Sequence, residues 1–461
     1  MECAERSAKR TLTPLEGDAS DMAKRGGANR HRMLIMLRFA RKPGALILCL
    51  LAVCVAPVFG QESPLQVGVT GSTPQEDAKN PTFILGTADV QHLVLEIAEQ
   101  PRERAYLDEA IAGMPFTVED MVTVGLLREE EGLYWIDFNL LRVEDQLAIL
   151  SLSDEMGRDL AKSVLERQAE FEALAAAHDQ PHLDAAHFLF IVLGCFSLDW
   201  DGLELTENKG YRAGAQRTLD GESFTPWAKE RGAEVSLEGL YWGSHSEAVN
   251  EFTFTTFGDH HSLPRFGLPD MLWRTGEAFG RYANLPVERR AAARLLSTYL
   301  RDALNDIARV MATLRTRDHT QGELAEVTGI EEDKLERIVG LLEGADYVAV
   351  EGETIQGRAL VLTARDAALV REIVAMGREI MITWHEANYA AIRERLADLT
   401  PTLNGVPFER VYTEVWHFIF GIANRTLVDQ GFFADPYSNE RRHRGFLPVI
   451  WKNGIEEGGT E

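Results

Sequence analysis

The stretch "GELAEVTGIEEDKLERIVGLLEGADYVAV", residues Gly322–Val350, decides how the chain is interpreted. Apolar residues recur at helical spacing on both sides of Gly329, which predicts two short helices joined by a tight turn. Thr320 is a suitable N-cap for the first helix because its hydroxyl can accept a backbone N–H. The following "YVAVEGETIQGRALVLT" (347–363) alternates around a glycine-containing loop and predicts a hairpin.

Longer amphipathic segments flank this stretch, and the 461-residue chain with 45% hydrophobic residues is long enough for two or three packed domains. Helices are expected at 287–316, 320–328, 331–342, 364–399 and 409–428. The sequence therefore predicts a mainly α fold with small β-hairpins, in the α+β class.

Three short matches recur in the same order along the chain. One such match would be chance, but three in order indicate an internal duplication into two divergent units. Aligning the histidine matches without a gap places Asp199 opposite Asp429. The matches are "VGLL" at 124–127 and 339–342, "HFLF" at 187–190 with "HFIF" at 417–420, and "LPDMLW" at 268–273 with "LPVIW" at 447–451.

The first half of the chain repeats the order of elements expected in the second half. Its "EVSLEGLYWGSHSEAVNEFTFTTFGDHH" segment (234–261) is an insertion that predicts two strands. The other expected elements are helices at 90–99, 106–112 and 118–127, a hairpin at 133–152, and helices at 154–178 and 183–196.

Residues 33–60 have the three-part layout of a secretory signal: basic residues, an apolar run at 45–56, and Val58 and Gly60 at the positions read by a signal peptidase. The run is short for a membrane span. We therefore expect an extracytoplasmic protein, periplasmic or secreted, with no stable membrane span after cleavage. If the signal stays uncleaved, the protein is membrane-anchored with the same orientation.

Charge and cysteine content bound the choice of partners. Residues 61–461 hold 37 Lys and Arg against 67 Asp and Glu, a net charge of −30 that repels nucleic acid. Cys195 is the only cysteine after residue 60, so an intrachain disulfide is excluded there. A protein partner or self-association is the expected mode of interaction.

The order helix, helix, turn, helix, hairpin, helix, with "ELAEVTG" (323–329) before the turn and "LVLT" (360–363) closing the hairpin, resembles the winged helix-turn-helix family of bacterial regulators. The resemblance is clearest at 320–363, and a degenerate copy lies near 105–152. It implies that the hairpin is a wing and that the second short helix occupies the place of a DNA-reading helix.

At that helix the chain departs from the family pattern. The recognition helix of the family opens with Ser, Thr, Arg or Gln, which contact bases and phosphates. Here the corresponding residues are Glu331, Glu332 and Asp333, and the first copy has Glu119 and Asp120. Carboxylates repel phosphates, so these acidic residues disfavour DNA binding. The resemblance therefore supports a winged-helix architecture and not the DNA-binding function of the family.

These inferences predict four segments. They are an N-terminal extension with signal peptide (1–60), a flexible linker (61–82), a winged-helix-like unit 1 (83–280) carrying an inserted α/β segment (about 204–262), and a winged-helix-like unit 2 with a C-terminal helix (281–461).

One cluster favours a different class of function. Asp199 and Asp201 in "DWDG", with Asp259, His260 and His261 in "GDHHS", are residue types that can hold divalent ions and activate water. The tripeptide resembles that of phosphoesterases named for Asp-His-His, although their early His-x-Asn-x-Asp element is absent. The alternative is a loop in which Asp and His cap turns.

Other histidines and tryptophans have mainly structural interpretations. His187 and His417 recur in apolar helices, either as a paired ligand site or, as we favour, as core histidines bonded to backbone carbonyls. His385 in "HEANY" lacks a second histidine and is expected on a helix surface. Trp273 and Trp451 are expected to anchor the core or an interface.

The sequence contains no phosphate loop, dinucleotide fingerprint, nucleophile elbow or His-Glu-x-x-His zinc motif. We therefore predict a non-enzymatic, exported, acidic binding or assembly protein without a cofactor. Two alternatives stay open. One is a metal-dependent hydrolase using the Asp/His cluster, and the other is a DNA-binding regulator if the chain is not exported.

Overall fold

All the residues that the computed structural model describes lie within Ser63–Glu461. The predicted extension and signal at 1–60 lie outside it. The described residues are 63–71, 73, 80–219, 221–232, 244–249, 252–257, 287–435 and 451–452.

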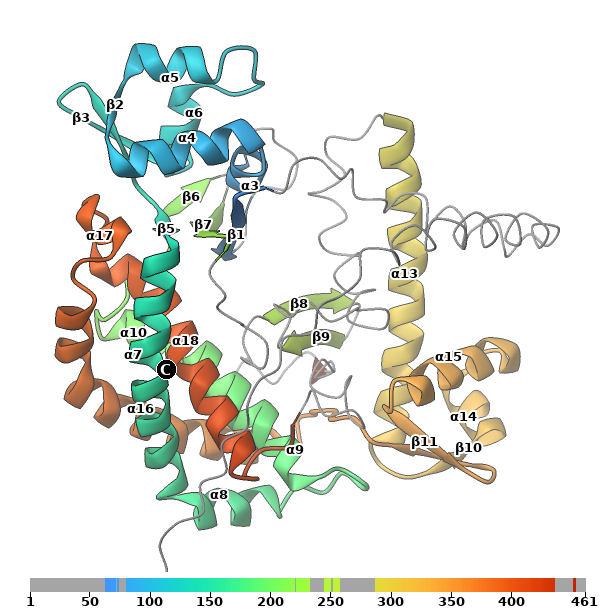
Figure 1. The fold of residues 1–461 in the computed structure, drawn as a ribbon. Coiled ribbons are helices and arrows are strands. Elements are labelled where there is room, and N and C mark those ends of the chain that lie inside the picture. Colours follow the sequence, from blue (N-terminus) through green and yellow to red (C-terminus); the bar gives the residue numbers. More distant parts are fainter. Residues whose placement is uncertain are drawn as a thin grey trace, which may run out of the picture. The chain divides into compact units, whose positions relative to one another are not determined.

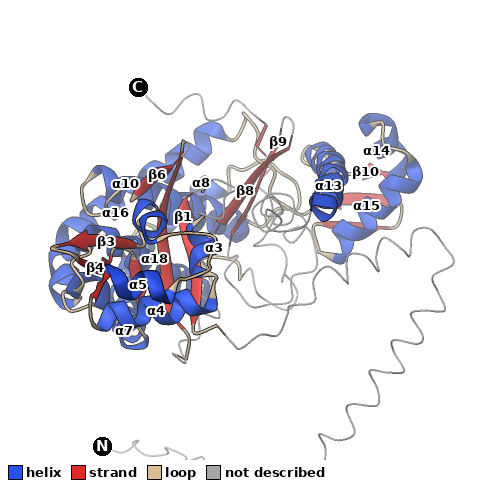
Figure 2. Ribbon diagram, turned by 90° about the horizontal axis from the view of Figure 1, so that it is seen from above, coloured by secondary structure: helices blue, strands red, loops and turns tan. Residues whose placement is uncertain are grey.

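Helices dominate the described residues, and the mainly helical α+β fold predicted from the sequence is confirmed (Figure 1; Figure 2). The helices are α3 (Pro81–Leu85), α4 (Ala88–Glu99), α5 (Arg104–Ala110), α6 (Val118–Thr123), α7 (Val143–Leu165), α8 (Gln168–Ala175), α9 (Ala185–Leu189), the π-helix η2 (Phe190–Asp201), α10 (Gly202–Asn208), α13 (Val287–Leu314), α14 (Gln321–Thr328), α15 (Glu332–Gly344), α16 (Ala367–Arg395), α17 (Thr400–Leu403) and α18 (Phe408–Asp429).

The strands form small sheets. One joins β1, β7 and β5, with β6 also paired to β7, and the others have the orders β2-β4-β3, β10-β12-β11 and β13-β9-β8. The strands are β1 (Leu65–Gly71), β2 (Arg102–Glu103), β3 (Leu127–Glu130), β4 (Leu133–Ile136), β5 (Asn139–Leu141), β6 (Arg217–Leu219), β7 (Glu222–Glu230), β8 (Ser244–Val249), β9 (Phe252–Phe257), β10 (His319–Thr320), β11 (Val348–Glu351), β12 (Thr354–Gly357) and β13 (Trp451–Lys452).

Two segments have the same topology. The first motif (Arg102–Ile136) and the second motif (His319–Gly357) each run strand, helix, helix, hairpin, and in both the third strand lies between the first and the second. The hairpin registers also agree. Leu127 pairs with Ile136 in the first motif, and Val348 pairs with Gly357, each 221 positions later, in the second.

The turn that leads from the second helix into the hairpin repeats at this spacing. Gly125 and Asp346 both adopt positive φ, at 76° and 60°. The next residue in each motif, Leu126 or Tyr347, is fully buried and donates its N–H to a carbonyl five residues earlier, over 2.9 and 2.8 Å. Glycine adopts this conformation readily, whereas at Asp346 a positive φ is uncommon for a non-glycine residue.

This geometry corrects the predicted match of the two "VGLL" sequences. Residues 339–342 lie inside α15, whereas 124–127 form the turn into β3. The residue equivalent to Leu127 is Val348, because both begin the first hairpin strand. The sequence match fails because apolar tetrapeptides suit both a helix and a buried turn.

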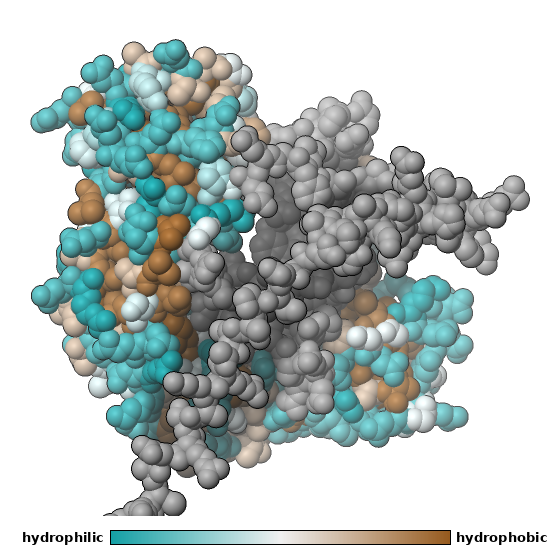
Figure 3. Space-filling view, viewed as in Figure 1, coloured by the Kyte–Doolittle hydropathy of each residue, from teal (hydrophilic) through white to brown (hydrophobic). Residues whose placement is uncertain are grey.

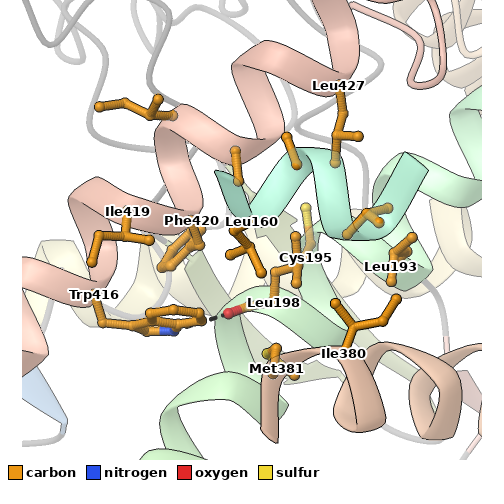
Figure 4. Packing of buried hydrophobic residues seen from close by; sticks show 14 of the residues in the cluster. Leu160, Leu193, Cys195, Leu198, Ile380, Met381, Trp416, Ile419, Phe420 and Leu427 are labelled. Carbon is orange, nitrogen blue, oxygen red and sulfur yellow. Dashed lines mark hydrogen bonds between the residues drawn. The ribbon is translucent and has the colours of Figure 1, made fainter. Parts of the chain in front are cut away.

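The largest hydrophobic core is helical and draws on α7, η2, α16 and α18. Helix α18 packs along α7, and α16 packs along η2. Figure 4 shows Trp416 of α18 directing its indole N–H at the carbonyl oxygen of Leu198, 3.0 Å away. Both predicted units, 83–280 and 281–461, therefore contribute to one core.

A glycine allows the close contact between α7 and α18. A Cβ on Gly157 of α7 would lie 2.7 Å from the carbonyl oxygen of Ile419 and 2.8 Å from the Cβ of Ile422. These distances are too short for any side chain, so α7 and α18 meet where only glycine fits.

Two smaller cores support the two motifs. The first motif packs with α3, α4 and residues of β1 and β7, including Leu65 and Phe224. The second motif packs with the C-terminal half of α13 and with Phe254 of β9.

The structure corrects two predictions in the first half. The expected linker at 61–82 contains strand β1, whose Leu65 is buried because β1 pairs with β7. The expected hairpin at 133–152 is wrong, because β4 pairs with the preceding β3, β5 pairs with β7, and α7 begins at Val143. Residues 143–152 mix alternation with helical spacing, and burial of Ile149 and Leu152 on one face selects the helix.

Candidate functional site

Local capping fixes the start of the second motif. The Thr320 hydroxyl accepts the N–H of Glu323 at 3.3 Å, and a Glu323 carboxylate oxygen accepts the N–H of Thr320 at 2.8 Å. This capping box confirms Thr320 as the N-cap. Gly329 ends α14 in the left-handed region with φ of 66°, which turns the chain into α15.

Helix α15 presents an acidic first turn. Its apolar face is buried, whereas Glu331, Glu332 and Asp333 are exposed. Within the part of the chain that the structure describes, their side chains form no hydrogen bond or ion pair. The nearby Lys334 pairs with Asp306 of α13 instead. Acidic side chains at a helix N-terminus interact favourably with the helix dipole, so these carboxylates stabilise α15 although no cation pairs with them in the described residues.

Both hairpin turns are acidic as well. In the first motif Glu129, Glu130 and Glu131 are exposed at the end of β3, and in the second Glu351 and Glu353 flank the turn between β11 and β12. The helix and hairpin faces thus carry the same sign of charge in both motifs.

The first motif compensates part of its charge internally. Arg104 donates hydrogen bonds to both carboxylate oxygens of Glu119, one of them at 3.0 Å, and to Asp108 at 2.8 Å. The hydrogen bonds from Arg104 lower the pKa of Glu119. The other predicted acid, Asp120, caps α6 by accepting the N–H of Thr117 at 2.9 Å. The acidic face of the first motif is therefore partly neutralised.

Hydrophobic surface gathers elsewhere. On the face seen in Figure 3, hydrophilic residues cover most of the first motif, and hydrophobic residues gather over α7 and α17. The exposed fractions of Leu147 on α7 and Leu403 on α17 are 50% and 68%.

The predicted Asp/His cluster is only partly visible. Asp199 is buried in η2, and burial raises its pKa to about 7. Asp201 accepts a hydrogen bond from Arg378 at 3.0 Å, so a cation of the protein already lies beside this carboxylate. Asp259, His260 and His261 lie outside the described residues. Among the residues that are described, no group of three or more His, Cys, Asp or Glu side chains is arranged to hold a metal ion.

The predicted histidines lie on helices of the core. His417 of α18 bonds through Nδ1 to the carbonyl oxygen of Thr413, at 2.6 Å, which confirms the backbone-bonded interpretation for this residue. His187 lies on α9 with 3% of its surface exposed.

The prediction for His385 is wrong, because this side chain is buried rather than on a helix surface. Its Nδ1 bonds to the carbonyl oxygen of Met381 at 2.8 Å, and its ring stacks on Tyr211 with ring centroids 5.4 Å apart. Burial lowers its pKa to about 4, so the ring is neutral at neutral pH. Trp384 of α16 and Trp416 of α18 also lie beside the ring.

Sequence reasoning missed a buried ion pair. Lys229 of β7 and Glu414 of α18 lie 2.8 Å apart with 8% and 5% of their side chains exposed. The Lys229 ammonium also lies over the rings of Trp227 and Phe418, at 4.8 and 5.4 Å. The sequence did not predict strand β7, and the pairing of Lys229 with Glu414 depends on the tertiary fold.

Two further predictions are only partly within reach. Trp451 lies in β13, which pairs with β9 opposite Thr253, whereas Trp273 is outside the described residues. None of the helices in the described residues combines the length and the apolar character needed to cross a bilayer.

Comparison with known proteins gives no relative: no family model, curated protein or solved structure matches the chain.

Proposed function

We propose that the two motifs are divergent winged-helix-like units, descended from an internal duplication, that share one helical core. The proposal is supported by their common strand order, their equal hairpin register and the repeated positive-φ turn at Gly125 and Asp346. The turn and the strand register are both repeated at the same spacing of 221 residues, as expected of a duplicated unit.

We further propose that the protein is a binding or assembly module that contacts a protein partner through its helix and hairpin faces. The observation that carries this proposal is the exposed, uncompensated acidic turn Glu331–Asp333 at the place where a winged helix reads DNA. Carboxylates repel phosphate and attract lysine and arginine, so a basic protein surface is the complementary partner. The acidic hairpin residues Glu351 and Glu353 extend the same surface.

An extracytoplasmic location belongs to the same proposal and rests on the signal-like residues 33–60. It is tested by N-terminal sequencing of the protein purified from its own cells, together with fractionation. A mature chain beginning at Gln61 supports export and removes the chromosome as a target.

The binding surface is tested with defined probes. A triple variant with Glu331→Lys, Glu332→Lys and Asp333→Lys is compared with a matched control that reverses Glu372, Glu386 and Glu394, which are exposed on α16. Fluorescence anisotropy with a labelled oligolysine peptide at low salt should show weaker binding for the first variant, by about tenfold, and a smaller change for the control.

Labelled duplex DNA is the second probe in the same assay. The proposal expects no DNA binding by the wild-type chain at low salt. Equal loss of peptide binding in both triple variants, or tight DNA binding with a steep salt dependence, contradicts the proposed surface and favours the regulator alternative.

A further inference from the structure

The loop between α8 and α9 reaches the second half of the chain through four polar side chains. They belong to His178, Asp179, Gln180 and His182, and each contacts a residue between Arg315 and Asp366. The segment His178–His182 is called the clasp below. Its partners lie on the two stretches that enter and leave the second motif.

Gln180 binds the stretch that leaves the second motif. Its side-chain amide donates to the carbonyl oxygen of Ala359 and accepts the N–H of Val361 at 2.9 Å. Gln180 is 5% exposed, so the pair of hydrogen bonds is shielded from water. The Gln180 amide thus makes the two hydrogen bonds, one donated and one accepted, that the backbone of a neighbouring strand would make.

Arg315 holds the stretch that enters the second motif. Its guanidinium donates to Asp366 at 2.9 Å and to Asp179, and only 3% of its side chain is exposed. His178 Nε2 lies 3.4 Å from the same Asp366 oxygen. Burial alone would raise the pKa of Asp366, but His178, the Thr363 N–H and Arg315 together lower it to about 2.

A fourth contact lies at the rim. His182 Nε2 lies 3.0 Å from a carboxylate oxygen of Asp318, and both side chains are about one third exposed. The clasp therefore grips the chain both before β10 and after β12.

Residues 359–362, which follow the second motif, contact two hydrophobic cores. Ala359 and Val361 belong to the core of the second motif, whereas Leu360 and Leu362 belong to the helical core. This alternation places residues 359–362 between the core of the second motif and the helical core.

The first motif is fastened differently. The equivalent residues after its hairpin, 139–141, form β5, which pairs through its backbone with β7. Asp145, the equivalent of Asp366, accepts the backbone N–H of Thr400 at 2.9 Å, and among the described residues no arginine side chain forms an ion pair with it. A strand in a sheet cannot detach without breaking a ladder, whereas side-chain bonds can open one at a time.

We propose that the clasp is a conformational device that fixes the second motif on the helical core and that its opening lets this motif reorient while both cores stay folded. The acidic face of the second motif then moves relative to that of the first. This role of the clasp does not depend on which partner the second motif binds.

The experiment is hydrogen exchange and limited trypsin digestion of the full chain. Two variants open the clasp: Arg315→Met removes the buried charge, and Asp179→Asn is mild because 57% of that side chain is exposed. Asp154→Asn, which removes a surface ion pair with Arg158 on α7, is the control.

The clasp variants should raise amide exchange about tenfold in 315–318 and 358–366, with both cores still protected. Trypsin should cut faster after Arg317 and Arg365, which are exposed beside the joint. Exchange that rises equally in the helical core, or that stays unchanged in Asp179→Asn, overturns the proposal. The control should match the wild-type chain.

Discussion

Asp145 and Asp366 hold the same bond at the same place in the two halves of the chain. Each accepts the backbone N–H of the residue three positions earlier, from Arg142 and Thr363, and both distances are 2.7 Å. Beyond that bond they diverge, since Asp366 lies beside Arg315 while Asp145 accepts a backbone N–H of α17. The same backbone geometry thus carries two different electrostatic environments, which leads to opposite pKa shifts.

Replacing Asp366 by Asn should lower the free energy of unfolding at pH 7 by about 2 to 3 kcal/mol. Its pKa of about 2 lies below that of an unfolded aspartate, so its stabilisation is present above about pH 4 and is lost as the pH falls toward 2. Urea unfolding followed by circular dichroism should show the difference from wild type shrinking across that range. A difference that stays constant contradicts the assignment.

Asp199 should behave in the opposite sense. Its pKa is raised to about 7 by burial, so the folded state favours the protonated form and loses stability as the pH rises from about 4 to 7. Asp199→Asn should match wild type near pH 4 and exceed it by up to about 4 kcal/mol at pH 8. Thermal unfolding at both pH values measures this. An Asn variant that is less stable at pH 8 would show that the carboxylate has a stabilising partner.

Gly157→Ala should destabilise the chain by about 1 to 3 kcal/mol, because the new Cβ meets the backbone of α18. Gly340→Ala is the matched control, since that position in α15 has open space around it. The control should gain up to about 1 kcal/mol from helix propensity. Denaturant midpoints for the two variants should move in opposite directions.

The hydrolase alternative makes a prediction about metal content. Protein purified without chelators should contain no stoichiometric divalent metal by elemental analysis, and His260→Ala should leave its thermal stability in added Mn²⁺ or Zn²⁺ unchanged. Metal at one or two equivalents, lost in the His260 variant, would restore the hydrolase interpretation.

Much of the second half could be predicted from the sequence because its signals are local. Thr320 and Glu323 form a capping box within four residues, and Gly329 marks a turn that needs positive φ. These residues determine their own backbone, so the short helices and the hairpin follow from them.

Other features in both halves were harder to predict because they depend on partners that are distant in the sequence. Strand β1 exists because β7 pairs with it, and Leu65 lies opposite Glu230 far along the chain. His385 is buried by aromatic residues of α18 as well as its own helix. Lys229 and Glu414 form an ion pair, but the sequence around each residue gives no sign that the two side chains meet. Contacts of this range are properties of the assembled fold.

The packing of α7 on α18 has a consequence for synthesis. Helix α7 and η2 emerge from the ribosome long before α18, as the separation of 218 residues between Leu198 and Trp416 illustrates. At about 5 to 20 residues per second, the apolar surface of η2 waits roughly ten seconds or more for its cover. A nascent chain stopped before α18 would therefore leave that apolar surface without its cover.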